Sequence, residues 1–65
     1  MRLEKILPAL RRGRRARRSS WSDGTYLVQR SKDGSFRLIE GKDERGFAWF
    51  ASEIVATDWE LVDGD

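Results

Sequence analysis

A run of arginines separates an apolar, helix-like segment from the strand-like segments that follow it. Six of the chain's ten arginines fall between Arg11 and Arg18, and Trp21 follows them. The run is either a basic tail for nucleic acid or an edge strand with one arginine turned inward. Along a strand, alternate side chains share a face, so Ala16, the apolar residue of the run, shares its face with Arg18. We therefore expect Arg18 to point inward. The arginines expected to stay in solvent are Arg14, Arg15 and Arg17.

An inward Arg18 needs an acceptor, because an unpaired charge is costly to bury. Asp58 or Glu53 would supply one within the protein, and a ligand phosphate held by the planar guanidinium is the alternative. In either case the alternation predicts that Arg18→Ala harms the protein more than Arg17→Ala.

The length of 65 residues predicts one small domain, residues 1–65, with a marginal hydrophobic core. The chain has no cysteine and no histidine, which excludes disulfides and the usual ligands of structural zinc. Small domains without such links are often stabilised by association, so we expect a homo-oligomer, a dimer or a tetramer. The charge is also divided: residues 1–18 carry +7 and residues 19–65 carry −5. This division indicates an anionic partner for the first part or pairing between subunits.

Apolar residues predict a helix over about residues 3–12. They are spaced as on one helix face: Leu3, Ile6, Leu7 and Leu10. Gly13 suits the position just after the helix, where a left-handed residue commonly ends it. Pro8 conflicts with a regular helix interior, because it lacks a backbone donor.

Strands are predicted over residues 15–18, 26–30, 36–40, 47–50 and 59–62. Asp33-Gly34 is a hairpin signal between two of them. The charged segment from Gly41 to Gly46 is interpreted as a loop, and Ser52 to Ala56 as one helical turn with Ser52 as its N-cap. The resulting architecture is α+β: an N-terminal helix followed by a small antiparallel sheet of four or five strands.

The order of these motifs resembles the second type of Thoeris anti-defence protein, a family of small phage and bacterial proteins. Its opening pattern corresponds to Leu10-Arg11-Arg12-Gly13, Arg14-Arg15, Arg18-Ser19-Ser20-Trp21, Gly24 and Tyr26-Leu27. Its closing pattern corresponds to Trp49, Glu53-Ile54-Val55 and Ala56-Thr57-Asp58-Trp59-Glu60-Leu61-Val62. The chain departs from the family in three places. Its middle, from Arg30 to Gly46, is compact, Ala16 replaces a larger aliphatic residue, and Glu53 replaces a common Asp.

The resemblance implies a sponge that binds a cyclic ADP-ribose-type immune signal, and cyclic dinucleotides in some related members, without cleaving it. It also implies symmetric oligomers with pockets formed between subunits. If the protein is encoded by a phage, it would act in the cytoplasm of the bacterial host.

Six residues are the candidates for ligand binding: Arg18, Trp21, Ser22, Asp23, Tyr26 and Asp58. Trp21 would stack on the base, as aromatic side chains do on nucleic-acid bases. Asp58 or Ser22 would reach a ribose hydroxyl. For each residue a structural role is the alternative. Trp59 is expected to lie in the core, and Trp49 in the core or at a subunit interface.

An enzyme is not expected, since the sequence offers no histidine, no cysteine and no Gly-rich phosphate loop. No cofactor and no metal are expected either. The chain has no apolar run of about 20 residues, so we expect no membrane span and a cytoplasmic protein. The alternative function is a small basic nucleic-acid-binding protein that uses the Arg11–Arg18 run with Trp21 and Tyr26.

Overall fold

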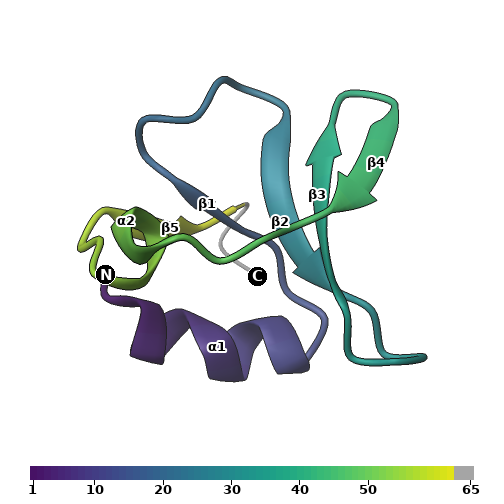
Figure 1. Cartoon of the computed structure of the whole chain (residues 1–65), viewed down its shortest axis with the longest axis horizontal. Helices are drawn as coiled ribbons and strands as arrows, with labels where there is room; N and C mark the ends of the chain where they lie inside the picture. The colour runs from purple at the N-terminus through teal and green to yellow at the C-terminus, as the bar shows by residue number, and fades with distance from the viewer. Residues whose placement is uncertain (63–65) are drawn as a thin grey trace.

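One antiparallel sheet runs through the structure, a computed structural model that describes residues 1–62. Its strands are β1 (Ala16–Arg18), β2 (Thr25–Gln29), β3 (Phe36–Glu40), β4 (Asp43–Gly46) and β5 (Trp59–Leu61). They lie in the order β4-β3-β2-β1-β5, so the last strand of the chain pairs with the first (Figure 1). The helix at the start of the chain and this sheet confirm the predicted α+β fold.

Helix α1 (Leu3–Arg11) ends one residue earlier than the sequence indicates. Its C-terminus closes as a Schellman motif: Gly13 N donates to Leu10 O at 2.9 Å, and Arg14 N donates to Ala9 O at 3.0 Å. Gly13 has a φ of 90°, which confirms the predicted left-handed position after the helix. Pro8 lies inside α1 on its exposed side, and the helix continues past it.

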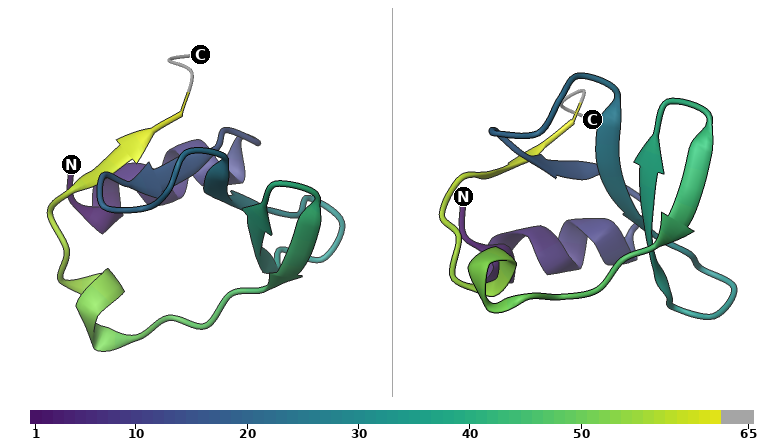
Figure 2. Two further views of the ribbon diagram at one scale, coloured as in Figure 1. Left: turned by 90° about the horizontal axis from the view of Figure 1, so that it is seen from above. Right: turned by 45° about the horizontal axis from the view of Figure 1, so that its top comes forward.

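The two faces of the sheet differ in what covers them. Strand register places Ala16 opposite Leu27 and Arg18 opposite Trp59, so these side chains share one face, here called the inner face. Helix α1 packs against this face (Figure 2). The fully buried core lies between them and consists of Ile6, Leu10, Ala16, Leu27 and Trp59. The predicted core position of Trp59 is confirmed.

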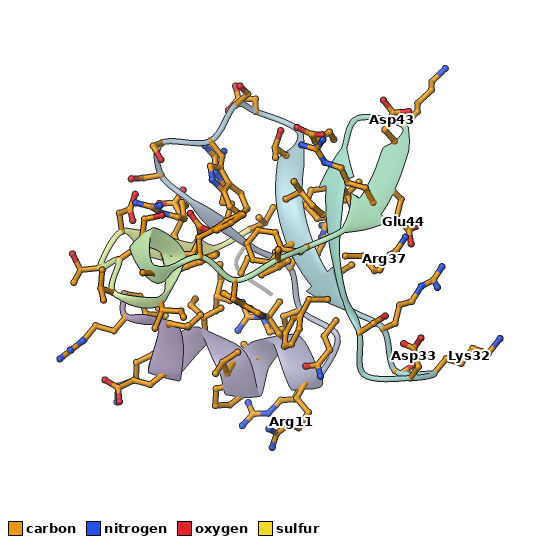
Figure 3. All side chains as sticks on the ribbon, viewed as in Figure 1. Arg11, Lys32, Asp33, Arg37, Asp43 and Glu44 are labelled. Atoms are coloured by element: carbon orange, nitrogen blue, oxygen red, sulfur yellow. The ribbon has the colours of Figure 1, made fainter. Side chains whose placement is uncertain are left out.

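The outer face carries the alternate side chains of the same strands, and they form ion pairs. Arg17 Nε lies 3.6 Å from Glu60 Oε1. Arg37 Nε lies 3.0 Å from Glu44 Oε2, and Figure 3 shows these two side chains together on the β3–β4 hairpin. The inner face therefore carries the buried core, and the outer face carries ion pairs beside Tyr26, Val28 and Ile39, as expected when only one face is covered.

The fourth strand differs from the sequence prediction. The charge pattern from Gly41 to Gly46 favours a loop, but Asp43–Gly46 forms β4 and pairs with β3 from Glu40↔Asp43 to Arg37↔Gly46. All four residues of β4 are exposed. An edge strand of this kind has no apolar face to give it an alternating hydrophobic pattern, which is why the sequence does not reveal it.

The strand predicted over residues 47–50 is wrong, because this segment forms no strand. It leaves β4 and runs as an extended connection to α2 (Ala51–Ile54), as Figure 2 shows. The predicted helical turn is present, but its N-cap is Phe50 rather than Ser52. The side chains of Phe47 and Trp49 pack against the core instead of continuing the sheet.

Candidate ligand-binding groove

An open groove of about 610 Å³ lies on the inner face, near β3 and β4. Strand register places Thr25 opposite Glu40 and Leu38 opposite Arg45, so these four side chains share the inner face beneath the groove. The segment from Gly46 to Glu53 and the β1–β2 turn form its walls. The lining residues are Ser20, Trp21, Ser22, Thr25, Leu38, Glu40, Arg45, Gly46, Phe47, Ala48, Phe50 and Glu53.

Trp21 belongs both to the groove and to a connected set of aromatic rings. Its ring centroid lies 5.5 Å from that of Trp59 and 6.1 Å from that of Phe47, with the rings edge to face in both pairs. The set continues from Phe47 to Trp49 at 4.9 Å. Edge-to-face pairs of this kind are favourable beyond the area that they bury. Trp21 is therefore held in place by packing while remaining partly exposed to the groove.

Arg18 points inward, as predicted, and it pairs with two carboxylates. Its Nε donates to Asp58 Oδ1 at 2.9 Å, and its Nη1 lies 3.6 Å from Glu53 Oε2. The hydrogen bond from Arg18 lowers the pKa of Asp58 below its ordinary value, because it favours the ionised carboxylate. Of the two alternatives for Arg18, the structure thus shows the pairing with carboxylates, and Arg18 is not among the residues that line the groove.

Glu53 connects this ion-paired cluster to the groove wall. Its Oε1 accepts from Phe50 N at 3.2 Å, and its backbone oxygen accepts from Trp59 Nε1 at 3.0 Å. Arg18 holds the carboxylate from the other side. Arg18 and Asp58 therefore act on the groove indirectly, by fixing the turn of helix that carries Glu53.

Arg17 corrects the expectation that it remains in solvent. Its side chain is only 19% exposed, and its Nη2 donates to the backbone oxygens of Trp21 and Ser19. Its Nη1 also lies 3.4 Å from Asp23 Oδ1. Although it extends on the outer face, Arg17 folds over the β1–β2 turn and ties that turn together.

The structure brings together only part of the predicted site. Trp21 and Ser22 line the groove, whereas Asp23 lies outside it and contacts Arg17. Tyr26 is on the outer face, where Arg15 covers its ring at 5.1 Å from the centroid. The buried Leu27 next to it fixes this orientation, since neighbouring residues of a strand point to opposite faces.

Several lining residues are missed by the sequence analysis. The sequence pattern places Phe47 and Phe50 in a strand and Arg45 in a loop. Only the register of β4 against β3 places Arg45 beside Leu38 on the inner face. The sequence contains one signal for these lining residues, the spacing of the aromatic residues after Gly46. This spacing favours packing against the core as much as it favours a strand.

The charges of the groove are largely compensated within the protein. Arg45 Nη2 lies 2.9 Å from Glu40 Oε1, and Glu53 is paired with Arg18. What remains for a ligand is a set of aromatic rings beside the hydroxyls of Ser20, Ser22 and Thr25. Such a surface suits a flat aromatic ring attached to a hydroxyl-rich group.

Residues 1–62 contain neither a cluster of metal-ligand side chains nor a membrane-spanning helix. No group of three or more acidic side chains there is placed to hold a metal ion. No helix in this part of the chain is long and apolar enough to cross a membrane.

No curated protein matches the sequence. The model of the Thoeris anti-defense 2-like domain matches residues 1–62, which are the residues that the structure describes. The match spans α1, all five strands and the groove, and it supports a role against Thoeris defence. The chain belongs to the Thoeris anti-defense 2-like family.

Proposed function

We propose that the protein acts as a sponge that binds a cyclic ADP-ribose-type immune signal in the inner-face groove and holds it uncleaved. The observation that carries the proposal is the groove itself, in which aromatic rings of Trp21 and Phe47 adjoin the hydroxyls of Ser20, Ser22 and Thr25. Membership of a Thoeris anti-defence family supports the choice of ligand class.

Each part of such a ligand has a matching group in the groove. The adenine ring would stack on Trp21 or Phe47, a contact worth roughly 1–3 kcal/mol per base. The serine and threonine hydroxyls would exchange hydrogen bonds with ribose hydroxyls. Arg45, whose side chain is 65% exposed, is the cation that lines the groove; its Nη2 would keep its pair with Glu40 while its other guanidinium donors bind a phosphate.

The acidic side chains of the groove support capture rather than turnover. A general base needs a carboxylate that is free to take a proton from the substrate. Glu53 is held by Arg18 and by Phe50 N, and Glu40 is held by Arg45. We therefore propose that the protein is not an enzyme and that bound ligand returns unchanged.

The compensated charges also predict how binding responds to salt. A binder that follows a nucleic-acid backbone loses affinity steeply as salt increases, because it displaces many counterions. A groove with one lining arginine neutralises few phosphates, so we expect only a modest loss of affinity.

The experiment is to incubate the protein with cyclic ADP-ribose isomers and cyclic dinucleotides, remove free ligand by filtration, heat the retained fraction and identify what is released. We expect an intact cyclic ADP-ribose isomer. Retention of no compound from the panel, or release of a hydrolysed product, would contradict the proposal. Retention of RNA with a steep salt dependence would favour the nucleic-acid alternative.

A pair of variants tests whether the ligand binds in the groove. Arg45→Met removes the lining cation, which is exposed enough for the fold to tolerate the change. We expect it to weaken retention, whereas Tyr26→Leu on the outer face should leave retention unchanged. Equal loss in both variants would place the site elsewhere.

A further inference from the structure

The charged side chains of residues 1–62 that line the groove carry more negative than positive charge. They are Glu40, Glu53 and Arg45. Arg18 offsets Glu53 from outside the groove, because its Nη1 lies 3.6 Å from Glu53 Oε2. On the strand side of the groove this leaves the cation Arg45 with the carboxylate Glu40 beside it. A surface that only attracted phosphates would not place a carboxylate next to its cation.

The stability of the sheet does not explain the charge of Glu40. The register of β4 against β3 places Asp43 directly opposite Glu40, and Figure 3 shows Asp43 near the turn of this hairpin. Like charges directly opposite each other destabilise an antiparallel pair. Lys42 lies in the turn between them and does not line the groove. A carboxylate in such a place therefore points to a role in the groove.

Arg45 would bring any phosphate that it binds close to Glu40. Arg45 Nη2 lies 2.9 Å from Glu40 Oε1. A guanidinium presents several N–H donors in one rigid plane, so other donors of Arg45 remain for a phosphate. The phosphate and the Glu40 carboxylate would then contact two edges of the same small group. At so short a separation their negative charges repel each other.

The strength of this repulsion depends on how the phosphate is bonded. An internal phosphate, which is joined to two groups, carries one negative charge. A terminal phosphate carries about −1.5 to −2 at pH 7, because its second pKa is about 6. Arg45 supplies a single positive charge, and Glu40 already balances it. The extra charge of a terminal phosphate therefore meets Glu40 without a further cation to compensate it.

We propose that Glu40 is a specificity-determining residue, which admits ligands whose phosphates are all internal and rejects ligands that end in a terminal phosphate. This inference rests on the function proposed above and defines its ligand class more narrowly. Cyclic ADP-ribose isomers and cyclic dinucleotides contain only internal phosphates, whereas free nucleoside mono-, di- and triphosphates end in a terminal one. A repulsive group directed at the wrong ligand is a common source of specificity.

The test measures binding by calorimetry in the unchanged protein and in Glu40→Gln, which keeps the shape of the side chain and removes its charge. ADP is the ligand with a terminal phosphate. ADP-ribose and a cyclic ADP-ribose isomer contain the same adenosine diphosphate with internal phosphates only. In Glu40→Gln we expect the affinity for ADP to rise at least about tenfold and the other two affinities to change by less than about threefold.

Glu44→Gln is the matched control. Glu44 belongs to the same hairpin, its side chain is 39% exposed against 42% for Glu40, and it lies on the outer face beside Arg37. The control removes the same charge at similar exposure from the opposite face, so it should change none of the three affinities. Circular dichroism shows whether each variant is folded.

An affinity for ADP that stays the same in Glu40→Gln, or that rises equally in Glu44→Gln, would overturn the proposal. A large loss of affinity for the cyclic isomer in Glu40→Gln would also overturn it, because Glu40 would then be a contact that the ligand needs. If no cyclic isomer binds the unchanged protein, the function proposed above fails. The affinity for ADP in the two variants still decides whether Glu40 repels a terminal phosphate.

Discussion

The two faces of the sheet are built from the same strands, but the charged side chains on them have different surroundings. On the outer face, Arg37 and Glu44 pair in partial contact with water. On the inner face, Arg18 is accepted only with two carboxylates beside it, Asp58 and Glu53. Water solvates the charges of the outer-face pair, so that pair costs little stability. The partly buried Arg18 instead needs carboxylates that come from distant parts of the chain. The inner face thus carries both the buried core and the groove.

The largest loss of stability should come from a substitution on the inner face, at Trp59. Its side chain is 1% exposed, and its indole nitrogen bonds to Glu53 O. Trp59→Ala should cost about 3–5 kcal/mol, enough to unfold a domain of marginal stability. Urea denaturation followed by circular dichroism is the measurement, with Val28→Ala on the outer face as control. A cooperative transition close to that of the unchanged protein would contradict the assignment of Trp59 to the core.

Substitutions of Arg18 and Arg17 compare how much neighbouring residues on the two faces contribute to stability. Arg18→Met leaves Asp58 and Glu53 without their cation, so we expect a lower Tm and faster amide hydrogen exchange in α2. Arg17→Met should also lower the Tm, because it releases the β1–β2 turn, but α2 should keep its protection. Equal loss of protection in α2 would show that Arg18 does not hold that helix.

The pH dependence of stability should reveal the Arg18–Asp58 pair. The pKa of Asp58 is lowered in the folded protein from an ordinary value of 3.8, chiefly by the hydrogen bond from Arg18. The stabilisation is therefore present above the unfolded pKa and is lost as pH falls through the folded pKa. Unfolding of the protein and of Asp58→Asn should be compared at several pH values.

We expect the difference between these two proteins to be largest near neutral pH and to shrink below about pH 4. Asp33, whose pKa is lowered by the hydrogen bond from Ser35 N, contributes with the same sign in both proteins and cancels. A difference that grows as the pH falls would contradict the pairing.

The smallest effect should come from Tyr26 on the outer face. Tyr26→Leu removes the ring beneath Arg15, and an exposed contact of this type is worth about 0.5–1 kcal/mol. Thermal unfolding should therefore shift slightly. A loss as large as that of Trp59→Ala would mean that the outer face is covered by another part of the protein.

The features of the fold that could be predicted from the sequence depend on residues that lie close together in the chain. The apolar spacing of α1 and the glycine after it are readable from a few residues, and so is the inward position of Arg18 beside Ala16. The hairpin at Asp33-Gly34 is also local: Gly34 has a φ of 75°, and Arg30 N donates to Ser35 O at 2.8 Å.

The groove is less predictable because it depends on register. Arg45 reaches the inner face only through the pairing of β4 with β3. This strand has no apolar residue from which the sequence could predict it. Tyr26 is a different case, because the signal that places it is local. Alternation along β2 puts Tyr26 on the face opposite to Leu27, and Leu27 is an apolar residue suited to the core. The sequence alone therefore contains enough to separate Tyr26 from a site on the inner face.

The central claim is that ligand binds on the inner face, in the groove, and leaves the outer face untouched. Amide chemical shifts during titration with cyclic ADP-ribose isomers test it most directly. We predict that shifts change at Trp21, at Phe47 and along the wall to Glu53, while Arg15, Tyr26 and Arg37 stay constant. Changes centred on the outer-face residues, or no changes with any isomer, would contradict the account.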